Sequence, residues 1–183
     1  MKLAISLIII VLIGIYLVTS WNRFKRLSIL VDEAFATMDI YLKKRWDLVP
    51  NMVNVVKGYT KHELEVFTEA IKLRSEAYSK MNMNEKIGLE SKLSAAIPSI
   101  YALSEAYPDL KSNENFIELS RSLTRIEEDI SQSRKYYNGA VKKYNTAVSL
   151  FPGNIVAGMF NFSTRPLYEI SEGEREVVNV SFE

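Results

Sequence analysis

The single histidine of this chain and its neighbour come nearest to a catalytic motif. His62 and Glu63 begin like the metallopeptidase signature H-E-x-x-H, but Val66 stands where that signature needs its second histidine. With one histidine and no cysteine, a metal site would have to be built from carboxylates. The densest acidic run, 127–129, has helical surroundings, where consecutive side chains point in different directions. We therefore predict no metal site and no cofactor.

Other catalytic signatures are also missing from the sequence. It contains neither a Gly-rich phosphate-binding loop nor a G-x-S-x-G nucleophile motif. A catalytic pair of carboxylates stays an open alternative, because no sequence pattern shows which two carboxylates the fold brings together. Because nothing else suggests a reaction, we predict no catalytic residues and expect that the protein is not an enzyme.

Polar residues near position 50 are better suited to recognition than to a reaction. Arg45 and Glu63 fall on otherwise apolar helical stripes, and a buried charge without a partner is costly. The structural expectation is therefore that Arg45 stays half-exposed at a helix end, while Glu63 pairs with a nearby Lys or Tyr. The functional alternative is that five polar residues form an interaction surface at the predicted turn near Pro50, at the end of the body far from the N-terminal apolar stretch. These residues are Arg45, Asp47, Asn51, Lys57 and His62.

Two matching Tyr-Asn pairs lie one heptad apart, at 137–138 and 144–145. They could line a cleft for a small ligand between helices, which would suit an extracytoplasmic sensor. Tyrosines at such spacing are more often core residues whose hydroxyl groups reach the edge of a bundle, and this is the interpretation that we favour.

The N-terminal stretch has the composition of a membrane span. Residues 3–22 carry no charge and are long enough to cross a bilayer, with Trp21 placed as an interfacial anchor. We predict a transmembrane anchor over residues 1–22 that contacts the lipid bilayer through residues 3–22. The alternative is a cleaved signal peptide, because 18–20 resembles a cleavage site. The basic residues at 23, 25 and 26 favour a single-pass protein with its body in the cytoplasm and its N-terminus outside.

The charge balance argues against nucleic acid as a partner. The 23 basic and 22 acidic residues are interspersed, whereas a phosphate-binding face needs clustered Lys and Arg. The lack of cysteine excludes a disulfide framework and agrees with either side of the membrane.

Beyond the anchor, apolar residues recur at 3–4 spacing, which is typical of amphipathic helices. The predicted helices cover 27–48, 52–77, 89–107 and 116–151. Four such helices joined by short turns favour an all-α fold, in which an up-and-down antiparallel four-helix bundle over 23–151 follows the transmembrane helix. Helices with heptad spacing also pair between chains as a coiled coil, so a homo-oligomer stays an alternative.

Prolines mark the expected ends of these helices. Pro50 should separate the first two, and Pro98 should kink or break the third near Ile97. The last part, 152–183, begins with an apolar, aromatic stretch that we expect to pack at the bundle end, close to the bilayer. It closes with a polar tail whose alternating apolar residues would suit one short, unpaired strand.

The block from Lys44 to Val53, KRWDLVPNMV, resembles the LemA family of bacterial membrane proteins. The similarity continues to about Glu169 through YPDLK at 107–111, the two Tyr-Asn pairs and Phe151-Pro152. The resemblance implies a single-span protein with its N-terminus outside and a cytoplasmic helical bundle. It also implies a scaffold or adaptor for membrane or cytoplasmic proteins, without established catalytic residues, substrate or cofactor.

Overall fold

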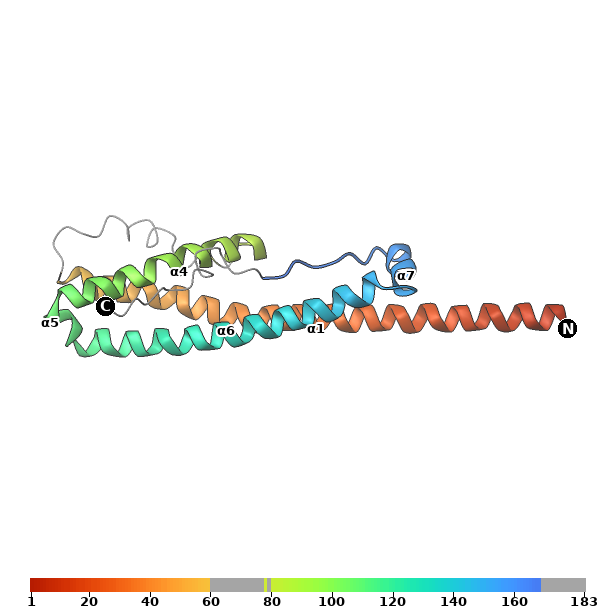
Figure 1. Ribbon diagram of the computed structural model, residues 1–183, viewed down its shortest axis with the longest axis horizontal. Coiled ribbons are helices and arrows are strands. Elements are labelled where there is room, and N and C mark those ends of the chain that lie inside the picture. Colours follow the sequence, from red (N-terminus) through yellow and green to blue (C-terminus); the bar gives the residue numbers. More distant parts are fainter. Residues whose placement is uncertain (60–77, 79, 169–183) are drawn as a thin grey trace, which may run out of the picture. The chain divides into compact units, whose positions relative to one another are not determined.

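The computed structural model describes residues 1–59, 78 and 80–168, and these are almost entirely helical. The helices are α1 (Lys2–Lys57), α4 (Met83–Ala106), α5 (Pro108–Lys111), α6 (Glu114–Ser149) and α7 (Gly153–Met159), as Figure 1 shows. No strand occurs within these ranges, which confirms the all-α prediction. Most of the helix predicted at 52–77, and the strand predicted in the tail after Tyr168, fall outside the described residues.

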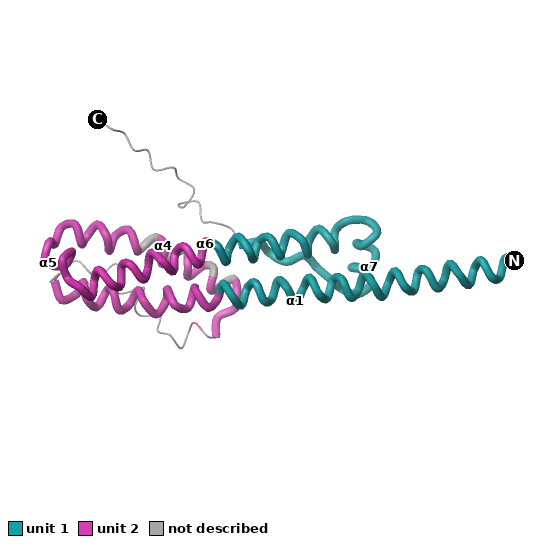
Figure 2. Tube along the Cα trace, turned by 90° about the horizontal axis from the view of Figure 1, so that it is seen from below, with its two compact units in different colours: residues 1–38, 132–168 teal, residues 39–131, 169–183 magenta. Residues whose placement is uncertain are grey.

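The chain divides into two compact units, coloured separately in Figure 2. Unit 1 consists of Met1–Met38 and Gln132–Tyr168, and unit 2 contains Asp39–Ser131 and Glu169–Glu183. Both α1 and α6 contribute residues to each unit. These unit boundaries differ from the domain boundaries at 22 and 151 that we predicted from the sequence. The predicted domain boundaries stay predictions.

Helix α1 runs through Pro50, so the predicted break at that residue is wrong. A proline inside a helix costs on the order of 3 kcal/mol, because one hydrogen bond is lost and the ring crowds the preceding turn. The apolar stripe continues on both sides of Pro50, with Trp46, Val49, Met52 and Val56 all buried. Burial of these side chains offsets the local cost. Helix α4 likewise continues through Pro98.

Part of the core of unit 2 lies between α1 and Tyr78, which precedes α4 in the sequence. The Trp46 indole stacks on the Tyr78 ring with 6.0 Å between the ring centroids, and both side chains are buried. Helix α4 begins with a capping box, in which the Asn82 side chain accepts from the Glu85 amide and the Glu85 carboxylate accepts from the Asn82 amide. Such a cap satisfies two backbone donors that would otherwise lack partners.

Unit 1 contains the apolar N-terminal part of α1. This part projects beyond the other elements of the unit in Figures 1 and 2, and its large apolar side chains from Leu3 to Val18 are exposed, except for the half-buried Leu17. By length and hydropathy, α1 is the one described helix able to cross a membrane. The contact with the rest of unit 1 begins at Ser20 and Phe24, which are buried.

The segment after α6 packs against α1 within unit 1, whereas its expected position at a bundle end close to the bilayer stays a prediction. The rings of Phe24 and Phe162 meet edge to face with centroids 5.4 Å apart. Val156 and Ala157 on α7 are buried. Gly153 lies so close to Ala147 that a β-carbon there would be 2.5 Å from the Ala147 carbonyl oxygen.

Gly153→Ala is therefore expected to destabilise unit 1 by about 1–3 kcal/mol, the usual cost of adding a methyl group to a filled space. The new methyl would meet a backbone oxygen, which cannot rotate away. The measurement is the free energy of unfolding of the full chain in detergent. Gly139→Ala is the matched control, because a β-carbon at that exposed site in α6 meets nothing within 4 Å. It should stabilise the helix by roughly 0.5–1 kcal/mol, and equal effects of the two variants would contradict the packing at Gly153.

Candidate functional site

The most buried charges of unit 2 surround Arg45. Its Nη1 donates to a Glu90 carboxylate oxygen at 2.8 Å, and its Nη2 donates to the Ser94 hydroxyl at 2.9 Å. Nε forms an ion pair with Glu127 at 2.8 Å, at an angle outside hydrogen-bond geometry. The side chains of Arg45 and Glu90 are 2% and 1% exposed, whereas that of Glu127 is 40% exposed. This cluster joins α1, α4 and α6.

The expectation of a half-exposed Arg45 is therefore wrong. Arg45 lies inside α1 rather than at a helix end, because the helix continues through Pro50 to Lys57. Its charge is compensated by Glu90, which lies 45 residues away in the sequence. Within the described residues the Arg45 side chain is thus buried rather than part of the exposed surface.

A second ionic contact in unit 2 involves Asp39. The Lys86 ammonium donates to both Asp39 carboxylate oxygens, at 2.7 and 2.8 Å, and the Tyr78 hydroxyl donates to the same carboxylate at 2.9 Å. Lys86 also lies over the Tyr78 ring. The Asp39 carboxylate, the Lys86 ammonium and the Tyr78 hydroxyl thus form one network.

The other predicted surface residues are distributed over the last turns of α1. Asp47 is exposed and pairs with Lys43 one helical turn earlier. Asn51 and Lys57 are exposed, and His62 lies outside the described residues. Asp47, Asn51 and Lys57 are thus the exposed members of the predicted interaction surface on α1. Their role in recognition stays a prediction.

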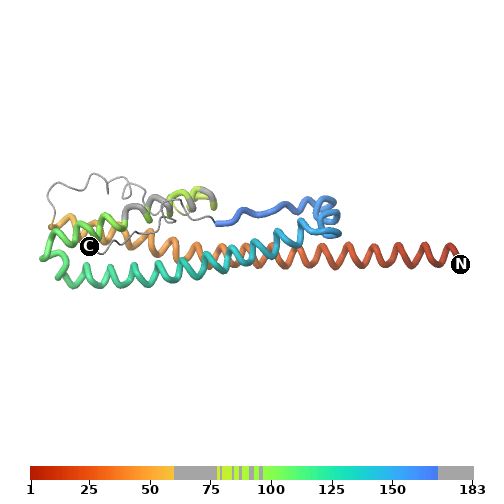
Figure 3. The backbone as a smooth tube through the Cα atoms, in the orientation of Figure 1, coloured from red at the N-terminus to blue at the C-terminus, as the bar shows by residue number. Residues whose placement is uncertain are grey.

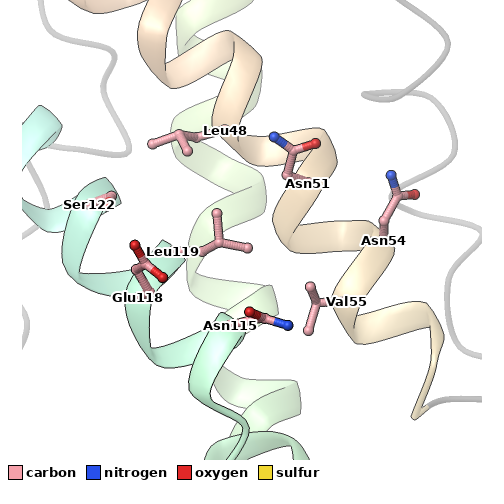
Figure 4. Close-up of a pocket in the computed structure, with 8 residues that line it drawn as sticks. All are labelled: Leu48, Asn51, Asn54, Val55, Asn115, Glu118, Leu119 and Ser122. Atoms are coloured by element: carbon pink, nitrogen blue, oxygen red, sulfur yellow. The ribbon is translucent and has the colours of Figure 1, made fainter.

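A groove between α1 and α6 adjoins Asn51. Its volume is about 440 Å³, and Figure 4 shows the residues that line it from both helices. They are Leu48, Asn51, Asn54, Val55, Asn115, Glu118, Leu119 and Ser122. Side-chain amides, a hydroxyl and one carboxylate here lie among aliphatic groups. Sequence reasoning missed the α6 side of this groove, because no local pattern indicates which helix faces are neighbours.

In unit 1, two asparagines of α6 hold the extended segment after α7, which runs back along the helix in Figure 3. Asn145 donates to the Arg165 carbonyl and accepts from the Arg165 amide, both at 2.8 Å. Asn138 forms the same pair of bonds with Tyr168, at 3.0 and 2.8 Å. We call these four bonds the asparagine ladder. The cleft considered for the Tyr-Asn pairs is thus occupied by the chain's own residues.

The tyrosines of the two pairs are core residues, as we favoured. Tyr137 and Tyr144 are buried, and the Tyr137 hydroxyl donates to the Pro166 carbonyl at 2.9 Å. Burial raises the pKa of both phenols above its usual value, although the nearby Arg165 opposes the shift.

The raised pKa of Tyr137 predicts a loss of stability in alkaline solution. Below about pH 10, the unfolded-state pKa, the protonated phenol contributes its full stability. As the pH rises from there through the higher folded-state pKa, the unfolded chain releases its proton first and this contribution is lost. Tyr137→Phe should therefore flatten the decline of unfolding free energy above pH 10. Parallel declines in variant and parent would contradict the assignment.

Taken together, the fold defines an all-helical protein with one long apolar N-terminal helix. The LemA family model matches residues 34–182, and the chain belongs to the LemA family. Protein LemA of Metamycoplasma hominis is 23% identical over 152 residues, which are 82% of this chain and 69% of that protein. Magnetosome proteins MamQ 1 and MamQ 2 of Paramagnetospirillum magneticum are each 25% identical over 83 residues. The matched parts are 45% of this chain and 30% of each magnetosome protein.

Proposed function

We propose that this LemA-family protein is a single-pass membrane protein whose helical body is a non-catalytic scaffold or adaptor for other membrane proteins. The observation that carries the proposal is the continuity of α1. One helix contains both an exposed, uncharged apolar stretch and the polar residues that organise unit 2. Exposed apolar surface of this extent is costly in water and favourable in a bilayer.

The packing of unit 1 supports a retained anchor over a cleaved signal peptide. Ser20 and Phe24 are both buried, so the body's contacts begin at the place where a signal peptide would be cut. Cleavage after Ser20 would leave the buried Phe24 ring almost at a frayed chain end.

For unit 2 we propose the up-and-down bundle. Asp39 contacts Lys86, and Arg45 contacts Glu90 and Ser94, so α1 and α4 advance in the same direction. Arg45 contacts Glu127, whereas the later residues 48–55 share the groove with the earlier residues 115–122, so α6 advances in the opposite direction. Lys57 at the end of α1 and Lys86, which contacts Asp39, thus lie about 27 Å apart along α1, the length of 18 helical residues. The antiparallel helix that the sequence predicts up to residue 77 stays a prediction, because residues 60–77 lie outside those that the structure describes.

We further propose that the body lies in the cytoplasm. Arg23, Lys25 and Arg26 are exposed directly after the apolar stretch, whereas Lys2 is the basic side chain before it. This asymmetry favours an external N-terminus. A partner would then meet the groove and the exposed Asp47, Asn51 and Lys57 from the cytoplasmic side.

The anchor is tested by the double variant Ile9→Arg and Ile13→Arg. Each arginine near the centre of a span opposes insertion by about 2.5–3.5 kcal/mol, so the variant should move from the membrane pellet to the soluble fraction. The parent should stay in the pellet after alkaline extraction. Ile40→Arg is the matched control, since Ile40 is an exposed isoleucine of α1 outside the apolar stretch. Release of the parent protein itself would contradict the anchor.

The adaptor role is tested by proximity labelling from the C-terminus in living cells. We expect a reproducible set of membrane-protein neighbours, which the variant Asn51→Arg and Asn115→Arg should reduce by crowding the groove. Lys44→Ala is the control, because Lys44 is exposed on α1 and does not line the groove. A neighbour set unchanged by the groove variant would contradict this binding surface.

A further inference from the structure

The turn before α7 and the outer side of α7 carry an apolar surface in unit 1. We define the α7 corner as residues 150–160, and its five exposed large side chains are Leu150, Phe151, Ile155, Met159 and Phe160. Their exposed fractions range from 45% to 79%. No charged residue occurs in the sequence between Lys143 and Arg165. An apolar surface of this kind on a soluble body needs a partner.

The inner side of α7 is apolar, and its outer side carries two large apolar side chains beside one exposed asparagine, Asn154. Val156 and Ala157 are buried against unit 1, whereas Ile155 and Met159, four residues apart, share an exposed face. A surface helix in contact with water usually carries polar side chains on its outer face. Apart from Asn154, the outer face of α7 therefore has the composition of a face buried in an apolar medium.

The α7 corner is fixed at the height where α1 leaves its apolar stretch. Gly153 lies against the Phe24 ring, and the Phe162 ring packs on the same phenylalanine. Phe24 follows Asn22 by two residues, which is about 3 Å along a helix. In Figures 1 and 2, α7 lies beside α1 where its N-terminal part begins to project. The corner is thus level with Trp21 and Arg23, residues suited to a bilayer interface.

We propose that the α7 corner is a second membrane contact, which inserts its exposed apolar side chains into the headgroup region of the bilayer that α1 crosses. This inference rests on the proposed membrane anchor and holds for either orientation of the body. Arg23, Lys25 and Arg26 are exposed at the same height and would bind anionic phospholipid headgroups. The continuity of this apolar surface with the membrane-spanning part of unit 1 favours lipid over a second protein. Two contacts with one bilayer would restrict rotation of unit 1 about the axis of α1.

Single-cysteine variants of the full chain test the proposal, because the sequence has no cysteine of its own. The variants are Phe151→Cys and Ile155→Cys at the corner, Lys142→Cys as an exposed control on α6, and Val18→Cys as a control in the span. Each carries a nitroxide spin label in vesicles of phosphatidylcholine and phosphatidylglycerol. Collision with oxygen, which concentrates in the bilayer, is compared with collision with a water-soluble nickel complex.

We expect the oxygen-to-nickel accessibility ratio at 151 and 155 to be several-fold higher than at 142 and to approach the ratio at 18. A ratio at 151 and 155 equal to that at 142 would overturn the proposal. So would protection from both reagents, which would indicate a protein partner or a second copy. A water-like ratio at 18 would instead overturn the membrane anchor, so the two failures are distinguishable.

Discussion

Replacing Arg45 with methionine should lower the free energy of unfolding by about 3–5 kcal/mol, the cost of removing one partner from a buried ion pair. The loss has a specific cause. Without the guanidinium group, the Glu90 carboxylate, whose side chain is 1% exposed, would lose its ion pair with Arg45, and Glu127 would lose its contact with Nε. The measurement is urea unfolding of the full chain in detergent, followed by circular dichroism.

A second substitution separates charge from packing. The double variant Arg45→Met and Glu90→Leu removes both members of the buried ion pair, and should recover most of the lost stability because a well-packed apolar pair replaces a buried ion pair at little cost. Glu127 can stay charged, since its side chain is 40% exposed. Asp47→Ala is the matched control, because the exposed pair with Lys43 contributes at most about 0.5 kcal/mol. Equal losses from Asp47→Ala and Arg45→Met would contradict the buried cluster.

The double variant Asn138→Ala and Asn145→Ala should release the segment 165–168 from α6. It removes all four bonds of the asparagine ladder, and each unpaired backbone group in a partly buried position costs about 1–3 kcal/mol. Hydrogen exchange gives a residue-specific test. The Arg165 and Tyr168 amides donate to Asn145 and Asn138, so both should exchange much faster in the double variant.

The single variants sharpen this test. Asn145→Ala should accelerate exchange at Arg165 more than at Tyr168, and Asn138→Ala should do the reverse. Asn154→Ala is the matched control, because this exposed asparagine of α7 lies outside the ladder. Unchanged exchange at both amides in the double variant would show that other contacts hold the segment.

The sequence predicts the helices of this protein well, because a stripe of apolar residues is a local signal. Leu123, Ile130, Tyr137 and Tyr144 follow the 3–4 spacing of one predicted segment, and the structure buries all four on α6. The apolar N-terminal stretch was equally easy to predict, because twenty consecutive uncharged residues indicate a membrane span without any knowledge of the fold.

Long-range partners were not predictable in the same way. The Arg45 side chain was expected to reach solvent because nothing near it in the sequence identifies Glu90 or Ser94 as its partners. The asparagine ladder was missed for a related reason. Side-chain amides that bind backbone groups impose no requirement on the types of residues that they bind, so residues 165–168 carry no complementary pattern.

The prediction at Pro50 shows the limit of a local rule. Proline disfavours the helix interior, but α1 continues because buried residues on both sides of Pro50 stabilise a single long helix. A local cost of a few kcal/mol is comparable to the burial of two large apolar side chains.

The central claim is that α1 anchors this protein in the membrane with its body in the cytoplasm. The most direct measurement uses the Lys142→Cys variant in living cells and a maleimide that cannot cross membranes. Residue 142 is exposed on α6, and the chain offers no other thiol. We predict that the variant stays in the membrane fraction, is unlabelled in intact cells and is labelled after permeabilisation. Labelling in intact cells would reverse the orientation, and recovery of the protein in the soluble fraction would contradict the anchor.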